Sequence, residues 1–205
     1  MTLPVPEARR VTRVPVRVRE LTVPVAQDTM KVCHLYLFRH GIAEGEHPEH
    51  PGRDTERRLT DKGRERTARA ALGLERLGIA PDVIWTSPYV RTRQTAQILA
   101  EVLGPSSGVE VHEQLACEGS NERLIEEIAG SAVRRILLVG HEPNLSEMTS
   151  LLVCGRGILR SRFKKAGFVH IEVHPVQQRV VGRLQAMLPP RVLRLLGGAD
   201  DDDRD

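Results

Sequence analysis

The sequence predicts an α/β fold: a three-layer α/β/α sandwich around a mainly parallel central sheet. Short apolar runs typical of buried strands alternate with longer segments of helical periodicity. Glycine and proline residues punctuate the boundaries between the two kinds of segment. Strands that alternate with helices in this way favour strand–helix–strand units and a parallel sheet with covered faces.

Five strands are expected, at residues 34–38, 83–85, 136–139, 168–173 and 180–184. Four helices lie between them. The first has Thr60 as its N-cap, ends at Gly78, and carries an apolar side of Ala70, Ala71, Leu74 and Leu77. The second starts at Ser87-Pro88, as an N-cap followed by proline at the first helical position, and ends at Gly104. The third carries Leu124, Ile125 and Ile128, and the fourth is capped by Asn144 with Leu145, Met148 and Leu152 on one face.

The two ends of the chain differ from the middle. Residues 1–30 are proline-rich with a short alternating stretch and are expected to be a poorly ordered extension. Residues 31–190 are expected to form one domain, and residues 191–205 an acidic C-terminal tail that ends in five Asp and one Arg. With 205 residues, the chain suits a single compact core.

Composition excludes several classes of protein. The three cysteines are too few and too scattered for a disulfide framework or a zinc knuckle. No apolar run is long enough to span a bilayer, and no apolar signal segment opens the chain, so a cytoplasmic protein without a membrane partner is expected. One Trp, two Tyr and three Phe offer few stacking surfaces for nucleic acid. The oligomeric state stays open, with a monomer favoured.

Three predicted strands end in residues that suit an anionic ligand. The first runs into Arg39-His40-Gly41, the second into Thr86-Ser87-Pro88 with Arg91 one turn later, and the third into Gly140-His141-Glu142. The carboxyl ends of parallel strands meet at one rim of a sheet, where ligands bind in α/β folds. Two arginines and two histidines should therefore lie together.

This set of residues has a definite chemical use. A neutral imidazole is a nucleophile that can accept a phosphoryl group covalently. Phosphoryl transfer depends mainly on positioning and on stabilising charge on the three equatorial oxygens. Two guanidinium groups and a protonated imidazole would supply positive charge with no metal or other cofactor. Gly41 is expected to leave room at the nucleophile, and the helix N-termini after Ser87 and Asn144 to add partial positive charge.

Four segments carry a resemblance to a known family: LYLFRHGIAEG, DTERRLTDKG, IWTSPYVRTRQTA and LLVGHEPNL. In this order they resemble the signatures of the histidine phosphatase superfamily, over residues 34–188. The D-x-x-R-x-L-T-x-x-G run from Asp54 to Gly63, GHEPNL and the late KKAGF segment most resemble its short bacterial branch, the SixA-type phosphohistidine phosphatases. The resemblance implies a phosphoglycerate mutase-like fold, His40 as the nucleophile, and Arg39, Arg91 and His141 as the phosphate pocket. Gly41 and Ser87 are expected beside the substrate.

The chain departs from larger members of that family between Pro105 and Ile128. Those members carry a long insertion there that covers the site and supplies a carboxylic acid. The shorter connection predicts an open site, and Glu118 is the nearest candidate for a general acid. Glu44 and Asp54 are weaker candidates, and Asp54 is better placed to pair with Arg57 or to orient the first loop. His47 and His50 lack the further ligands that zinc needs, so no metal site is predicted.

Three functions remain open at this point. The first is hydrolysis of phosphohistidine on a protein, through a covalent intermediate on His40. The second is a phosphomonoesterase acting on a small metabolite such as a sugar phosphate or a nucleotide. The third is a non-catalytic phosphate-binding module. A good leaving group such as imidazole needs a positioned acid less than an alkoxide does, and this favours the first.

Overall fold

The computed structural model describes residues 33–45, 51–155, 159, 161, 163–176 and 179–198, with side chains left out at 51, 52, 176 and 179. Its strands are β1 (Cys33–Arg39), β2 (Val83–Thr86), β3 (Val109–Val111), β4 (Arg135–Gly140), β5 (Phe168–Val176) and β6 (Arg179–Leu188). Its helices are α1 (Asp61–Arg76), α2 (Val90–Leu103), α3 (Asn121–Gly130), α4 (Asn144–Cys154) and α5 (Pro190–Leu196). Two short 3₁₀ helices, η1 (Pro51–Glu56) and η2 (Glu113–Leu115), lie in the connections.

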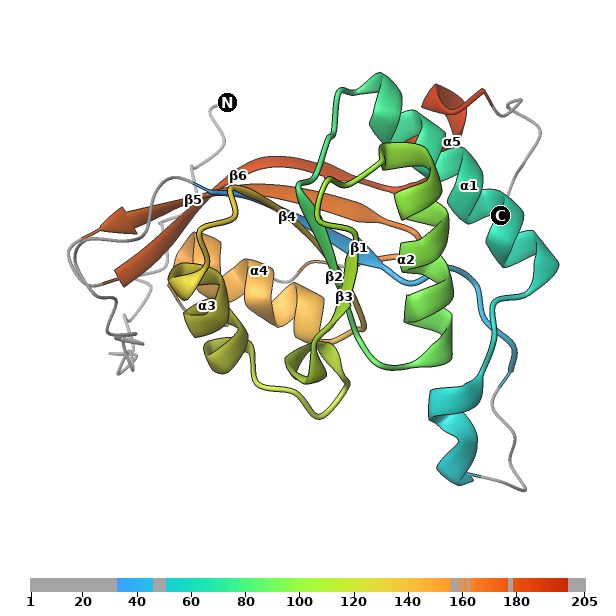
Figure 1. The fold of residues 1–205 in the computed structure, drawn as a ribbon, viewed down its shortest axis with the longest axis horizontal. Helices are drawn as coiled ribbons and strands as arrows, with labels where there is room; N and C mark the ends of the chain where they lie inside the picture. Colours follow the sequence, from blue (N-terminus) through green and yellow to red (C-terminus); the bar gives the residue numbers. More distant parts are fainter. Residues whose placement is uncertain are drawn as a thin grey trace, which may run out of the picture.

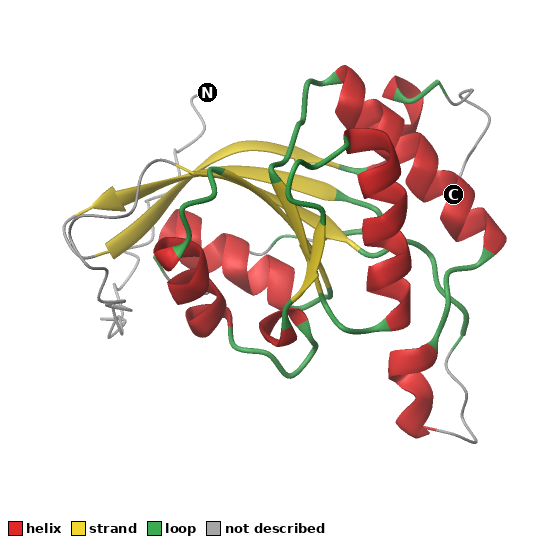
Figure 2. Cartoon of the chain, viewed as in Figure 1, coloured by secondary structure: helices red, strands yellow, loops and turns green. Residues whose placement is uncertain are grey.

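The strands form one sheet in the order β3-β2-β4-β1-β5-β6. The pairings β3–β2, β2–β4 and β4–β1 are parallel, while β1–β5 and β5–β6 are antiparallel. Helices α3 and α4 cover one face, and α1, α2 and α5 cover the other (Figures 1 and 2). The predicted three-layer α/β/α sandwich with a mainly parallel sheet is confirmed.

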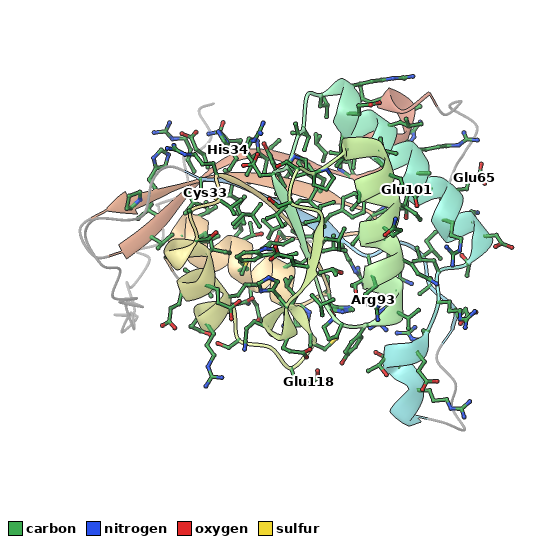
Figure 3. All side chains as sticks on the ribbon, in the orientation of Figure 1. Cys33, His34, Glu65, Arg93, Glu101 and Glu118 are labelled. Atoms are coloured by element: carbon green, nitrogen blue, oxygen red, sulfur yellow. The ribbon has the colours of Figure 1, made fainter. Side chains whose placement is uncertain are left out.

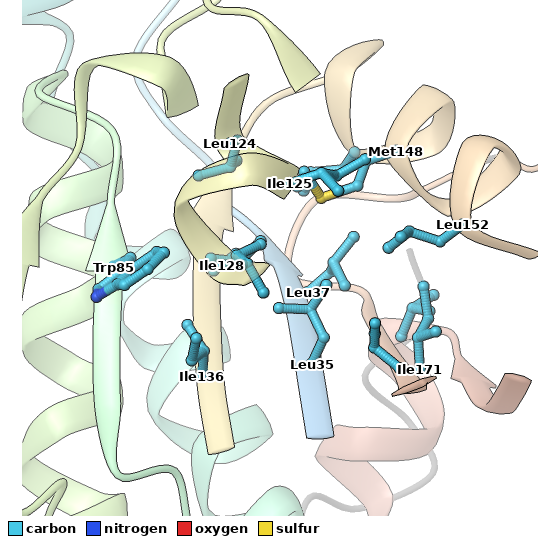
Figure 4. Packing of buried hydrophobic residues seen from close by; sticks show 14 of the residues in the cluster. Leu35, Leu37, Trp85, Leu124, Ile125, Ile128, Ile136, Met148, Leu152 and Ile171 are labelled. Atoms are coloured by element: carbon cyan, nitrogen blue, oxygen red, sulfur yellow. The ribbon is translucent and has the colours of Figure 1, made fainter. Parts of the chain in front are cut away.

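Alternating side chains along each central strand feed two cores. From β1, Leu35 and Leu37 pack with the apolar sides of α3 and α4, and Figure 4 shows this cluster around Trp85 and Ile128. Tyr36 and Phe38 point to the other face, toward α1, α2 and α5. Both faces of a parallel sheet are buried, so its strands read as continuous apolar runs. This is why these strands were detectable in the sequence.

Helix boundaries agree with the sequence at some ends and not at others. Thr60 is the N-cap of α1 and its Oγ1 accepts from the Gly63 amide at 3.0 Å. Leu77 was expected on the buried side of α1, but it is 45% exposed because the helix ends at Arg76 and the helical period stops there. The second helix starts later than predicted, with Tyr89 as the N-cap of α2.

The start of α4 also differs by one residue. Asn144 is its first helical residue rather than its cap. The Asn144 side-chain amide instead donates to the carbonyl oxygens of Ala116 at 3.1 Å and Cys117 at 3.3 Å. It thereby fastens the loop that carries Glu118 to the start of α4.

One strand and one α-helix lie where none was predicted, as do the two 3₁₀ helices η1 and η2. The edge strand β3 consists of three exposed residues, so it shows no apolar run in the sequence. Helix α5 occupies the first residues of the expected tail, and Leu193 is fully buried against the α1 side of the core. The boundary set at residue 191 therefore has to move, because residues 190–196 belong to the folded domain. The extension of residues 1–30 lies outside the described residues.

Cys33, Cys117 and Cys154 are free thiols. Within the described ranges, no helix combines the length and the apolar character needed to cross a bilayer.

Candidate active site

Strand register brings the three predicted strand ends together. Arg39 pairs with Gly140 between β1 and β4, and Thr86 pairs with Val139 between β2 and β4. His40, Ser87 and His141 therefore each follow one of three adjacent parallel strands, with His141 on the middle one. The His40 amide donates to the Gly140 carbonyl at 3.2 Å, which fixes the two loops to each other. The His40 and His141 ring centroids lie 5.2 Å apart.

The His40 ring is oriented by its own loop. Its Nδ1 lies 2.7 Å from the Gly41 carbonyl oxygen. A carbonyl oxygen only accepts, so Nδ1 carries the hydrogen and donates it. The lone pair is then on Nε2, the nitrogen with nucleophilic character.

The His40 ring is also held neutral. The residue is only 6% exposed, and burial, assisted by the charges of Arg91 and Arg39, lowers the pKa of His40 to about 3. The hydrogen bond to the Gly41 carbonyl works in the opposite direction but is the smaller effect. At neutral pH the ring is therefore an uncharged base.

His141 is held by two partners. Arg91 Nη2 donates to its Nδ1 at 3.3 Å, which leaves Nε2 to carry the hydrogen and donate to Ser87 Oγ at 2.9 Å. Burial and the neighbouring Arg91 lower the pKa of His141 to about 3. The expected protonated imidazole is therefore wrong for the unliganded site: His141 is a neutral donor, and the positive charge comes from arginines.

Arg91 projects from the first turn of α2 and is 3% exposed. Its two terminal nitrogens donate to Asp54, at 2.9 Å to the carboxylate and 2.6 Å to the backbone carbonyl. Its Cζ lies 4.9 Å from the centroid of the Tyr89 ring. The guanidinium is thus held by Asp54 of η1, by Tyr89 and by His141.

Asp54 forms ion pairs with Arg57 at 2.5 Å and with Arg91 at 2.9 Å. Partial burial tends to raise the pKa of Asp54, but hydrogen bonds from the two arginines outweigh it and lower the pKa. A carboxyl held ionised in this way does not serve as a general acid at neutral pH. The predicted Asp54–Arg57 pair is confirmed.

Arg39 is the last residue of β1 and directly precedes His40. Its Nη1 donates to the Phe163 carbonyl at 2.6 Å, which ties the end of β1 to the turn at residues 163–167. The turn is fastened a second time, because the Ala166 amide donates to the carbonyl oxygens of Arg39 and His40.

Gly41 and Ser87 have roles other than the expected ones. A Cβ on Gly41 would lie 2.4 Å from Thr67 Oγ1, so glycine is needed for packing of the loop against α1 rather than for space at His40. The Gly41 amide already donates to Thr95 Oγ1 at 3.1 Å. Ser87 is fully buried and holds the His141 ring, which makes it a positioning residue.

Glu118 lies in the loop after η2 and is exposed, at the lower edge of the molecule in Figure 3. The Tyr89 hydroxyl donates to its carboxylate oxygens at 2.9 and 3.1 Å, and the Tyr89 ring lies 4.8 Å from the His141 ring. Tyr89 thus links Glu118 to the site. Sequence reasoning missed Tyr89, although its place between Ser87 and Arg91 could have indicated it.

Among the described residues no group of three or more His, Cys, Asp or Glu side chains could hold a metal ion. The region with His47 and His50 lies outside the described part of the chain.

Comparison with known proteins adds family information to this geometry. Residues 35–120 match the family model of the histidine phosphatase superfamily, branch 1. An uncharacterized protein of Picosynechococcus sp. is 38% identical over 141 residues, covering 66% of this chain and 82% of that protein.

Solved structures with a similar fold include the protein assigned as the phosphohistidine phosphatase SixA of Agrobacterium tumefaciens, with a TM-score of 0.63 and 24% identity, covering 77% of this chain and 98% of that one. The protein histidine phosphatase SixA in complex with tungstate has a TM-score of 0.66 at 19% identity, covering 77% and 97% of the two chains. A mycobacterial glucosyl-3-phosphoglycerate phosphatase has a TM-score of 0.57 at 17% identity, covering 77% and 99%. At these identities the similarity concerns the fold.

Proposed function

Since the chain belongs to the histidine phosphatase superfamily, branch 1, we propose that it hydrolyses phosphohistidine on a protein through a covalent intermediate on His40. Family membership and the phosphatases among the structural relatives support phosphatase activity. The observation that carries the proposal is the neutral His40 ring, whose Nδ1–H donates to the Gly41 carbonyl and which lies within the electrostatic influence of Arg91 and Arg39.

In the proposed reaction the His40 Nε2 lone pair attacks phosphorus and the N–P bond of the substrate breaks. The electron pair of that bond goes to the leaving imidazole, which takes up a proton. Arg39 and Arg91 stabilise the charge on the equatorial oxygens, and the His141 Nε2–H becomes a further donor by exchanging its bond to Ser87 Oγ for one to the phosphoryl group. Water then attacks the phosphorylated His40, releases inorganic phosphate and returns the ring to its neutral form. No step needs a metal ion.

The nucleophile is tested by trapping the intermediate. We expect wild-type protein quenched in alkali to carry bound phosphate. This phosphate should remain in alkali and be lost when a sample is treated with acid, as a phosphoimidazole is. His40→Ala should carry none and should lose turnover because the attacking nitrogen is gone. His174→Ala, at the far end of β5, is the matched control and should keep both label and rate. Label retained by His40→Ala would contradict the assignment.

A rim without a long covering insertion supports a protein-borne substrate. The connection from Pro105 to Ile128 is occupied by β3, η2 and the first turns of α3, with β3 paired to β2 at the sheet edge. This leaves little chain in that connection to cover His40. A side chain that projects from another protein can enter such a rim, while a small metabolite makes few contacts with it.

One observation favours the metabolite phosphomonoesterase as the second candidate. The Tyr89–Glu118 pair beside His141 offers a carboxyl group that could protonate an alkoxide leaving group. The third reading, a phosphate-binding module without catalysis, predicts binding of phosphate with no trapped label on His40.

A substrate panel with Glu118→Gln separates the first two. We expect phosphohistidine peptide to exceed sugar phosphates in kcat/KM, and Glu118→Gln to cost less than about threefold on the peptide because imidazole leaves without a strong acid. On an alkyl phosphate the same change should cost about tenfold or more. Glu122→Gln, an exposed carboxylate at the start of α3, is the control. A sugar phosphate preferred by tenfold, about 1.4 kcal/mol in transition-state binding, would favour the metabolite enzyme.

A further inference from the structure

A second basic pocket adjoins the site on the Arg39 side. It has a volume of about 320 Å³ and is lined by the end of β1, the start of α1, the turn at residues 163–167 and helix α5. Arg39 lines this pocket and is also the residue next to His40. The pocket and the site are therefore neighbours that share one guanidinium-bearing residue.

The charge of the pocket is of one sign. Its charged lining residues are Arg39, Arg66, Lys164, Lys165 and Arg194, and no acidic side chain is among the described residues that line it. Two carboxylates nearby are engaged elsewhere. Asp54 pairs with Arg57 and Arg91, and Glu142 accepts hydrogen bonds from the amide and hydroxyl of Ser146.

The fold holds the two arginine side chains and the backbone that carries the two lysines. Arg66 and Arg194 are 7% and 3% exposed, so packing fixes their side chains. Lys164 and Lys165 are exposed, but they belong to a turn closed by the Gly167 amide donating to the Lys164 carbonyl at 2.8 Å. That turn is bonded to the backbone of Arg39 and His40. A pre-arranged cluster of this kind binds an anion without a large ordering cost.

The ionisation of Lys165 reflects burial first and the surrounding positive charges second. Partial burial, followed by the charges of Arg39, Arg57 and Arg91, lowers the pKa of Lys165. An anion in the pocket would offset these positive charges, and guanidinium forks suit a carboxylate in particular.

We propose that this pocket binds the carboxylate of an acidic residue that flanks the phosphohistidine of the substrate protein, while the phosphoryl group lies at His40. The proposal rests on the proposed function and specifies its substrate class: a phosphohistidine segment with an adjacent Asp or Glu. Arg39 would lie between the two anions and set their spacing.

The experiment compares two phosphohistidine peptides that differ only in Glu or Gln at the flanking positions. We expect wild type to prefer the Glu peptide at least fivefold in kcat/KM, mainly through KM. Lys164→Ala/Lys165→Ala should reduce the preference to below twofold and leave the Gln peptide within twofold of wild type. Arg123→Ala/Arg134→Ala removes the same charge from exposed positions near α3 and should keep the preference. Equal kcat/KM for both peptides in wild type, or an unchanged preference in the lysine variant, would overturn the proposal.

Two further measurements separate this inference from its premise. If neither phosphopeptide is turned over, the proposed function fails, and calorimetry with the unphosphorylated Glu peptide still tests the pocket. Binding weakened at least fivefold by the lysine variant supports the pocket, and no binding overturns it. The second measurement replaces Asp200–Asp203 and Asp205 by Asn in the full chain. An unchanged preference supports a substrate anion, whereas a fivefold rise in kcat/KM for both peptides alike would assign the pocket to the chain's own acidic end.

Discussion

At the residue scale, the chemistry of the site depends on how two histidines use their ring nitrogens. The His40 Nδ1–H donates a hydrogen bond to the adjacent Gly41 carbonyl, and the His141 Nε2–H donates one to Ser87 Oγ. Both rings are neutral because they are buried beside arginines. A bound phosphoryl dianion would add negative charge close to His141 and raise its pKa, so the ring would gain a proton as charge develops on the substrate.

The importance of the Arg91 guanidinium can be tested by a conservative substitution. Arg91→Lys should lower kcat/KM by at least about 100-fold, because an ammonium group cannot contact both Asp54 oxygens and His141 at once. Thermal unfolding measured in parallel should show that the variant folds. Arg93→Lys, two residues along the same helix and exposed, is the control and should keep the wild-type rate. Near-normal activity in Arg91→Lys would mean that a single positive charge is sufficient.

At the scale of elements, the turn at residues 163–167 and helix α5 together build the far side of the site. The turn carries Ala166 in the left-handed region, at φ 58°, a conformation that costs a residue with a Cβ about 1 kcal/mol or more. Hydrogen bonds from this turn to the end of β1 hold it in that conformation. Helix α5 then closes the pocket with Arg194.

A stability prediction tests whether α5 belongs to the domain. Leu193→Ala should destabilise the protein by about 2–4 kcal/mol, since Leu193 is fully buried between α5 and α1. Leu195→Ala, 40% exposed on the same helix, should cost less than about 1 kcal/mol. Urea unfolding of both variants measures the difference. If both substitutions lower the free energy of unfolding by the same small amount, residues 191–196 do not contribute to the core and belong to the expected tail.

At the scale of the whole molecule, the fold buries two histidines whose ionisation is linked to folding. In the unfolded chain each takes up a proton near its ordinary pKa of about 6.5, but in the folded protein only near 3. Between these values the unfolded state binds more protons, so stability rises with pH over this range and is lost as the pH falls.

The corresponding prediction is an acid-sensitive protein with a titration that depends on the site. From pH 6.5 to 3, the two histidines should together lower the free energy of unfolding by up to about 2.7 kcal/mol per pH unit, each contributing about 1.4. His40→Asn should reduce this slope by about half of that amount, measured by urea unfolding at successive pH values. His112→Asn, a histidine that stacks on Trp85 and pairs with Glu127, serves as the control. A wild-type slope that His40→Asn leaves unchanged would contradict a neutral, buried His40.

The sequence by itself determined the α/β class, the five strands with apolar runs, and the strand ends that carry His40, Ser87 and His141. These features are local: a buried parallel strand must be apolar along its length, and polar residues directly after it must lie at the sheet rim. Thr60 and Gly104 were readable for the same reason, since a cap satisfies backbone groups only a few residues away. The resemblance to the family rested on these same segments.

Tertiary structure alone decided what surrounds those residues. Four features depend on segments that are distant in the chain. They are the neutral state of His141, the ion pair of Asp54 with Arg91, the hydrogen bond from Tyr89 to Glu118, and the burial of Leu193. Ionisation and hydrogen-bond partners depend on burial and on neighbours across the fold, so no local pattern encodes them. The edge strand β3 shows the same limit, because its residues are exposed and only pairing with β2 makes them a strand.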